Sequence, residues 1–200
     1  MSRFDAAYYR QFYQDQPVHT AREIAELAKA VHHLCKWWKV PVTSVLDVGA
    51  GPGFWRDWYQ RHHPHVKVVS TDVSPHACKT YGHLQRDISR WSPRGKYDLV
   101  ICHSVLQYLT DQEASRALEN LTRATRHVLY LEVPTREDLS NVLDDEATDF
   151  KMRLRPASWY RKRLKVGFRQ AGAGLWIAHS GEVVLYTLEA AATSEKTKNN

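Results

Sequence analysis

The stretch from Val45 to Gly53 (VLDVGAGPG) constrains the fold of this chain more than any other. Its first four residues are apolar except for Asp47, which is typical of a buried strand. Three glycines follow at alternate positions, and glycine both accepts a positive φ and lets a ligand lie against the backbone. The pattern predicts a strand, a tight turn and a helix N-terminus, which together form a nucleotide-sized cradle of backbone N–H groups.

The spacing of the glycines indicates the kind of nucleotide. The dinucleotide fingerprint is G-x-G-x-x-G, whose third glycine allows the helix to pack closely on the strand. Gly49, Gly51 and Gly53 follow G-x-G-x-G instead, and the bulky Phe54 stands at the sixth position. Asp47 lies two residues before the first glycine, where a carboxylate would repel a pyrophosphate and suit a cation. We interpret the cradle as a site for a positively charged nucleoside without phosphate.

This set of residues resembles the first motif of the class I S-adenosylmethionine-dependent methyltransferases, in which an acid is followed by G-x-G-x-G. The resemblance covers roughly residues 43–189. It implies that the cofactor is S-adenosylmethionine, that the product is S-adenosylhomocysteine, and that the glycine loop passes beside the methionine part of the cofactor.

Two later segments supply further candidate cofactor residues. Asp72 follows a predicted strand at 66–71, where a carboxylate can accept both ribose hydroxyls. Asp72 could instead cap a helix, but Ser74 before Pro75 already fills the cap position. After a predicted strand at 83–88, the resemblance implies that Asp87 meets the adenine amino group, with a turn residue as the alternative. The expected cofactor-binding residues are Asp47, Gly49, Ala50, Gly51, Gly53, Asp72, Val73, Asp87, Ile88, His103 and Tyr13.

The order of predicted elements indicates an α/β fold. Strands alternate with helical segments, which favours a parallel sheet, at 45–48, 66–71, 83–88, 97–103 and 127–133. Two apolar runs at 174–180 and 182–189 are separated by little more than Ser180-Gly181, which predicts an antiparallel hairpin. We therefore expect a three-layer α/β/α sandwich with five parallel strands and a C-terminal hairpin. This is the seven-stranded methyltransferase fold and not the dinucleotide-binding one.

The N-terminal segment is expected to form accessory helices outside the core sheet. Tyrosines and phenylalanines recur at helical spacing within residues 4–15, and a capping box at Thr20 and Glu23 opens a helix to about Trp38. The resemblance implies that such helices form a lid, so we expect a lid at 1–40, a core at 43–189 and a flexible tail at 190–200 in one domain, 1–200. The alternative is that the tyrosines only pack an accessory helix onto the domain.

Transfer of a methyl group from a sulfonium needs chiefly an in-line nucleophile, and a base only where the acceptor loses a proton. Ligands of open α/β sheets lie beyond the carboxyl ends of the strands. This rule places His103, Glu132 and His179 near the reaction. Because histidine titrates near neutral pH, His103 is the candidate base for an oxygen acceptor. The alternative is that it only lines the cofactor pocket.

The chain lacks the motifs of several nucleic-acid methyltransferases. The fourth strand runs into Cys102-His103-Ser104-Val105 instead of [DNS]-P-P-[YFW], and no Pro-Cys pair is present. We therefore favour a small-molecule acceptor methylated on oxygen or nitrogen. The basic segment 151–169 leaves an RNA or protein methyltransferase as an alternative, although a solvated helix face beginning at Pro156 explains it better. A catalytically silent cofactor-binding domain is the other alternative.

Composition and residue usage set further bounds. The 200 residues are 43% hydrophobic and carry a formal charge of +6, which permits an acidic partner without requiring one. No run reaches the ~18 apolar residues of a membrane span, and no apolar signal-peptide region opens the chain. Three scattered cysteines fit reduced thiols, so a cytoplasmic location is expected. Several histidines, such as His32, are expected to be solvated near helix ends, and none has metal-binding spacing.

Overall fold

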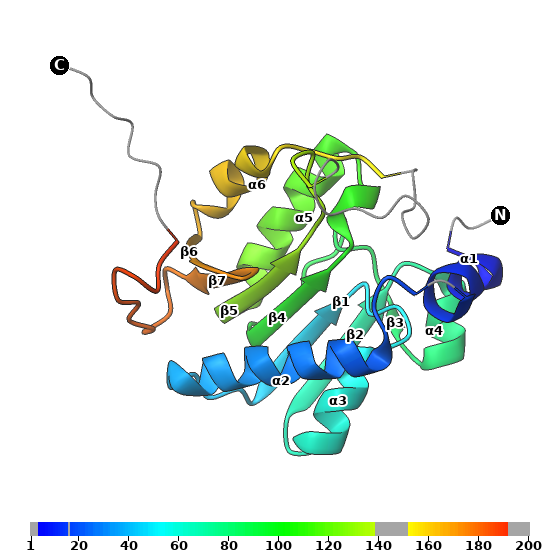
Figure 1. Ribbon diagram of the computed structural model, residues 1–200, viewed down its shortest axis with the longest axis horizontal. Helices are drawn as coiled ribbons and strands as arrows, with labels where there is room; N and C mark the ends of the chain where they lie inside the picture. Colours follow the sequence, from blue (N-terminus) through cyan, green and yellow to red (C-terminus); the bar gives the residue numbers. More distant parts are fainter. Residues whose placement is uncertain (1–3, 16, 139–151, 192–200) are drawn as a thin grey trace.

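A computed structural model describes residues 4–15, 17–138 and 152–191, and shows one seven-stranded sheet in the order β3-β2-β1-β4-β5-β7-β6 (Figure 1). The first five strands are parallel, and β7 runs antiparallel to both of its neighbours. The strands are β1 (Ser44–Val48), β2 (Lys67–Asp72), β3 (Leu84–Gln85), β4 (Tyr97–His103), β5 (Thr125–Glu132), β6 (Phe168–Gly172) and β7 (Leu175–Ala178). The predicted fold class is confirmed.

Helices cover both faces of the sheet (Figure 1). One core cluster joins α2 and α3 to one face, and a second joins α5 and α6 to the other. The helices are α1 (Ala6–Arg10), the π-helical turn η1 (Gln11–Asp15), α2 (Ala21–Trp37), α3 (Phe54–His62), α4 (Pro75–Tyr81), the 3₁₀ turn η2 (Leu106–Tyr108), α5 (Asp111–Ala124) and α6 (Ala157–Leu164). Among the described residues, no helix is long and apolar enough to cross a membrane.

Local sequence signals fix several helix starts. The side chains of Thr20 and Thr110 each accept the backbone N–H of a glutamate three residues later. The carboxylate of that glutamate accepts the backbone N–H of the threonine, so both predicted capping boxes form. Ser74 caps α4 through the Ala77 N–H, with Pro75 at the first helical position. These caps set where α2, α4 and α5 begin.

The predicted position of the C-terminal hairpin is wrong. The turn lies at Gly172-Ala173-Gly174, where all three residues have positive φ, and not at Ser180-Gly181. Phe168, which is buried in the core, begins β6, whereas residues 182–189 form no strand. Three apolar side chains in that range are 73–99% exposed and therefore do not pack in the core: Val184, Tyr186 and Leu188. The predicted third strand, 83–88, shortens to β3 at the sheet edge.

Two expectations about the N-terminal half are also corrected. The helix α2 is part of the sandwich, because it buries Ile24, Ala28 and Val31 in the cluster that contains Val128 and Ile177. His32 on the same helix is not simply solvated. Its ring stacks on that of His63 with centroids 3.9 Å apart, and burial lowers its pKa to about 4. Residues 192–200 of the predicted tail lie outside the described residues.

Candidate functional site

The glycine loop leaves the carboxyl end of β1 in the geometry that the sequence predicts. Gly49, Gly51 and Gly53 have φ values of +66°, +57° and +89°, which disfavour any side chain. A Cβ at Gly51 would lie 3.0 Å from the Tyr13 hydroxyl oxygen. The loop is anchored to β2 by the Ala50 N–H, which donates to Thr71 O at 2.9 Å.

Asp47 is a buried carboxylate beside this loop. It is 2% exposed, and its Oδ2 has no hydrogen-bond partner among the described residues. Burial raises its pKa to about 7, while the charges of His103 and Arg56 act in the opposite direction. Asp47 also lines a cavity of about 480 Å³ at this edge of the sheet. A buried carboxylate that lines a cavity and has one oxygen without a partner suits a cationic ligand.

Asp72 holds the loop in place. Its Oδ2 accepts the Gly51 N–H at 3.0 Å, and its Oδ1 accepts the Ser74 N–H at 2.8 Å. Ser74 fills the helix-cap position as predicted, and both oxygens of Asp72 bind backbone N–H groups. Each oxygen retains a further lone pair, so Asp72 can still accept a hydroxyl.

The predicted adenine contacts lie apart from the cavity. Asp87 accepts the Ser89 N–H at 2.8 Å in a turn, and Ile88 is buried in the cluster that contains α5. Neither residue lines the cavity, and Val73 is 46% exposed outside it. Their cofactor contacts stay predictions.

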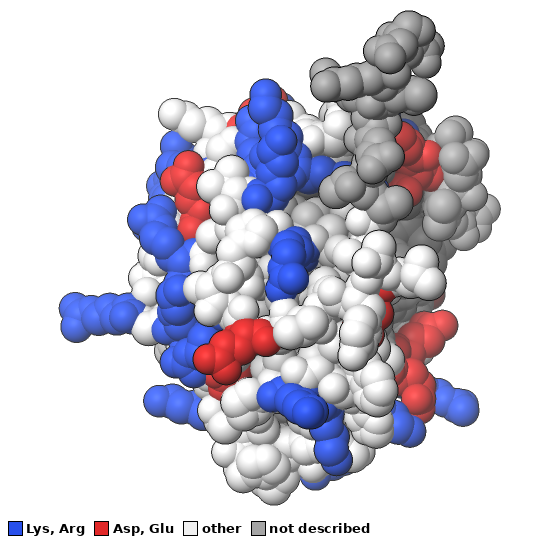
Figure 2. Space-filling model, turned by 90° about the vertical axis from the view of Figure 1, so that its left-hand side faces the viewer, with Lys and Arg blue, Asp and Glu red and all other residues white. Residues whose placement is uncertain are grey.

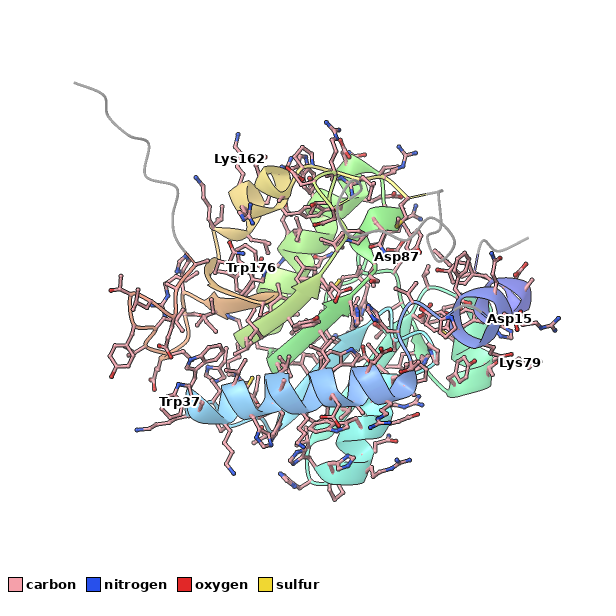
Figure 3. All side chains as sticks on the ribbon, in the orientation of Figure 1. Asp15, Trp37, Lys79, Asp87, Lys162 and Trp176 are labelled. Atoms are coloured by element: carbon pink, nitrogen blue, oxygen red, sulfur yellow. The ribbon has the colours of Figure 1, made fainter. Side chains whose placement is uncertain are left out.

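Aromatic residues of α1 and η1 cover the loop. Tyr9 and Tyr13 stack with ring centroids 5.3 Å apart, and Tyr9 also contacts the rings of His76 and Tyr81 on α4. Figure 3 shows Asp15 of η1 and Lys79 of α4 at the same end of the molecule. Burial raises the pKa of both Tyr9 and Tyr13, and the negative charge of Asp72 adds to this effect. The segment thus lies over Gly51, and it also reaches the residues that follow β4, because the Tyr8 and Tyr108 hydroxyl oxygens lie 3.0 Å apart.

His103 and Glu132 meet at the ends of the neighbouring strands β4 and β5. His103 Nε2 lies 3.0 Å from Glu132 Oε1, although the N–H direction is not aligned for a hydrogen bond. Tyr130 donates its hydroxyl to Glu132 Oε2 at 3.0 Å. Burial alone would raise the pKa of Glu132, but the contacts with His103 and Tyr130 outweigh it and lower the pKa to about 2. Both residues line the cavity, as the strand-end rule predicts.

Trp55 determines the tautomer of His103. Its indole N–H donates to His103 Nδ1 at 3.2 Å, so the neutral ring carries its proton on Nε2, towards Glu132. His19, His103 and Glu132 each offer a ligand atom within 4.8 Å of one another. A metal ion on Nε2 would require the proton on Nδ1, opposite the Trp55 N–H. The arrangement therefore favours a close His103–Glu132 pair over a metal centre.

His179 does not join this group. The strand β7 is antiparallel to β5, so its carboxyl end lies at the opposite edge of the sheet. His179 Nε2 lies 3.1 Å from Lys165 O, and the residue is exposed. The prediction that placed it near the reaction is wrong because it treated the strand as parallel.

The described part of the basic segment 151–169 packs largely against the protein itself. Arg155 is buried and donates to Asp111 Oδ1 at 2.8 Å, while the Arg163 guanidinium stacks 3.6 Å from the centre of the Trp159 ring. Lys162 of α6 projects outward (Figure 3). Figure 2 shows Lys and Arg side chains scattered over one end of the molecule, with acidic and uncharged residues between them. These contacts fit the helix-face alternative for α6.

Comparison with known proteins identifies the type of domain. Residues 46–127 match the family model described as a methyltransferase domain. The fold resembles that of magnesium protoporphyrin IX methyltransferase from Synechocystis PCC 6803, solved with bound S-adenosylmethionine, with a TM-score of 0.58 and 19% identity over 88% of this chain and 92% of that one. Residues 46–127 are thus similar to a methyltransferase domain. This match and the fold agree with the family predicted from the glycine motif, whose cofactor is S-adenosylmethionine.

Two curated methyltransferases match shorter parts of the chain. Trans-aconitate 2-methyltransferase from Azoarcus sp. (strain BH72) is 27% identical over 125 residues, which cover 58% of this chain and 46% of that protein. Malonyl-[acyl-carrier protein] O-methyltransferase 1 from Ilyobacter polytropus is 25% identical over 79 residues, covering 34% and 30%. The chain thus matches less than half the length of either methyltransferase.

The structure adds functional residues that the sequence patterns did not reveal. Tyr130 lies two residues before Glu132 on β5, and period-two alternation would have placed both on one face. Trp55 lies on the first turn of α3, directly after the glycine loop. His19 has no sequence signal, because only the fold brings it to His103.

Proposed function

We propose that this chain binds S-adenosylmethionine and transfers its methyl group to an oxygen or nitrogen of a small-molecule acceptor. The cofactor supplies a methyl group that is already activated by a sulfonium leaving group, so the protein mainly has to align the acceptor. The observation that carries the proposal is the buried carboxylate of Asp47, one of whose oxygens has no partner among the described residues, beside three positive-φ glycines and lining the same cavity as His103 and Glu132.

The residues of the cradle fit the cofactor. Asp47 offers a carboxylate to its cationic end, and the absence of a side chain at Gly51 leaves the backbone open to close approach. Asp72 orients the Gly51 N–H and keeps lone pairs for the ribose. Tyr13 stands over the loop as part of a lid formed by α1 and η1, while α2 belongs to the core. Binding of the adenosine part requires this lid to shift from Gly51.

His103 and Glu132 act together in handling the acceptor's proton. Glu132 is ionised at neutral pH and borders the cavity, so it can accept a hydrogen bond from the acceptor. For the imidazole to hold a second proton, Trp55 must release His103 Nδ1. If His103 acts as a base, Trp55 therefore has to move. If His103 only orients the acceptor, no such movement is needed.

Titration calorimetry with S-adenosylhomocysteine and turnover of labelled S-adenosylmethionine with pools of acceptors test the proposal. We expect His103→Ala to lower kcat by about 10²–10⁴ with nearly unchanged affinity for S-adenosylhomocysteine. His179→Ala, which alters an exposed histidine at the other edge of the sheet, is the matched control and should change neither. Lost affinity with intact kcat in His103→Ala would reduce His103 to a lining residue. A folded protein that binds no S-adenosylhomocysteine would refute the proposed function.

A further inference from the structure

The charge of the cavity runs against the charge of the whole chain. The chain carries 28 Lys and Arg against 22 Asp and Glu. The described residues that line the cavity nevertheless include three carboxylates, those of Asp47, Glu132 and Asp138, and no Lys or Arg. The chain thus has an excess of Lys and Arg, but none of them is among the described residues that line the candidate site.

The cofactor accounts for only part of this negative charge. Asp47 lies at the end of β1, beside the glycine loop, and its unpaired oxygen suits the cationic end of the cofactor. Glu132 lies at the end of β5, and β4 separates the two strands in the sheet. Two strand spacings correspond to about 10 Å, so one cationic group does not neutralise both carboxylates.

Neither of the two remaining carboxylates pairs with a Lys or Arg among the described residues, although His103 Nε2 lies 3.0 Å from Glu132 Oε1. Glu132 receives the Tyr130 hydroxyl, and Ser104 Oγ donates to its Oε1 at 3.2 Å, while 37% of its side chain stays exposed. Asp138 Oδ2 accepts the backbone N–H and the hydroxyl of Thr135 at 2.7 and 2.6 Å. Neutral donors thus help to position both groups, and no Lys or Arg among the described residues neutralises their charge.

Aromatic rings form the rest of the wall. Phe12, Phe54, Trp55 and Tyr108 line the cavity together with these acids. Aromatic faces attract cations and also pack on flat apolar bodies, and sites for organic ammonium ions combine such rings with carboxylates. The same surroundings disfavour an anion, because a carboxylate ligand would meet like charges and, among the described lining residues, two histidines but no Lys or Arg.

We propose that the methyl acceptor is an amine that is cationic at neutral pH and carries an aromatic or apolar body. This inference rests on the proposed function and narrows its acceptor class. It separates the chain from the relative named for trans-aconitate, since that acceptor is a carboxylate anion. The ammonium group lies against Glu132 and Asp138, and the apolar body lies against the aromatic wall. The ammonium first loses a proton to His103 or to water, and the nitrogen lone pair then takes the methyl group while the C–S bond breaks and S-adenosylhomocysteine leaves.

The test compares two ligands of one shape and opposite charge. Tryptamine and indole-3-propionate share an indole ring and a two-carbon linker, and they end in an ammonium and a carboxylate. Binding is measured by calorimetry on protein saturated with S-adenosylhomocysteine, which occupies the cofactor site without a sulfonium charge. We expect tryptamine to bind at least about tenfold more tightly than indole-3-propionate, with the difference shrinking as salt rises.

Substitutions locate the effect. Glu132→Gln and Asp138→Asn keep the hydrogen-bonding shape and remove one charge each, so each should reduce the preference for tryptamine severalfold. Glu119→Gln on the exposed face of α5 is the matched control and should leave it unchanged. Thermal unfolding confirms that each variant is folded.

The titration of S-adenosylhomocysteine alone tests the proposed function separately from the acceptor class. Binding of S-adenosylhomocysteine with no preference for tryptamine, or with tighter binding of indole-3-propionate, overturns the amine proposal and leaves the methyltransferase proposal standing. If the protein saturated with S-adenosylhomocysteine binds neither tryptamine nor indole-3-propionate, the amine proposal is also overturned. A preference that survives both Glu132→Gln and Asp138→Asn shows that these carboxylates do not create it, and overturns it as well.

Discussion

Replacement of Asp47 by asparagine should show how much the buried charge of this carboxylate lowers the free energy of unfolding. Asp47 is 2% exposed, and burial raises its pKa from the usual 3.8 to about 7. At 1.36 kcal/mol per pKa unit, this difference means that the ionised carboxylate destabilises the folded state by about 4 kcal/mol. Since part of that cost is relieved by local relaxation, we take about 4 kcal/mol as the upper bound for the effect.

The sign follows from the protons bound in each state. Between about pH 4 and 7, the folded protein keeps a proton on Asp47 that the unfolded chain has released. Because the folded state binds more protons, the contribution of Asp47 to the free energy of unfolding falls as pH rises through this window. Above about pH 7 the full cost is present. Asp47→Asn removes this titration, so we expect the variant to be more stable than the parent by up to about 4 kcal/mol at pH 8, with the gain vanishing towards pH 4.

Urea unfolding between about pH 4 and 8 measures the effect, and Asp98→Asn is the control of opposite sign. Asp98 is 1% exposed, but donors from Thr43, Ser44 and Arg126 outweigh the effect of burial and lower its pKa. Its charge therefore stabilises the folded state above the unfolded pKa, and Asp98→Asn should lose stability at pH 8. Calorimetry should show that Asp47→Asn also binds S-adenosylhomocysteine more weakly. An Asp47→Asn variant that is less stable than the parent at pH 8 would refute the reasoning.

Two further outcomes concern the lid and the loop. Gly51→Ala should weaken binding of S-adenosylhomocysteine at least about tenfold, because its Cβ would enter the space beside the Tyr13 hydroxyl. Gly82→Ala adds a Cβ at a similar positive φ with nothing within 4 Å, so it carries the same backbone strain and should leave binding intact; equal loss in both would assign the effect to strain. Limited proteolysis should cut before about Asp15 in the free protein and be slowed by S-adenosylhomocysteine, and cutting that is equal with and without ligand would leave α1 and η1 as plain packing.

The parts of the fold that the sequence predicts are those governed by local chemistry. The glycine loop needs positive φ at Gly49, Gly51 and Gly53, and such a requirement is visible in the residues themselves. The capping boxes at Thr20 and Thr110 likewise bind within a single helical turn. The alternation of strands with helical segments predicts the five parallel strands.

The errors arose where distant partners decide the outcome. Residues 182–189 are as apolar as a strand, yet two glycines at 172 and 174 place the hairpin turn earlier in the chain. That shift made β7 end at the opposite edge from the one assumed for His179. In the same way, nothing near Asp72 in sequence shows that the Gly51 N–H returns to its carboxylate. Hydrophobic periodicity indicates which residues are buried, but not which other residues they pack against.

The two acids at the ends of the cavity respond to their surroundings in opposite ways, and this difference orders the proposed binding events. Glu132 is ionised before any ligand arrives, because Tyr130 and His103 lower its pKa to about 2. Asp47 has a pKa of about 7, so near neutral pH it becomes fully ionised only when a cation approaches its unpaired oxygen. The cavity therefore presents a permanent negative charge on Glu132, at the acceptor end, and a charge on Asp47 that cofactor binding induces. A cationic acceptor would be attracted to Glu132 with or without cofactor, whereas the cofactor's affinity, and not the acceptor's, should follow the titration of Asp47.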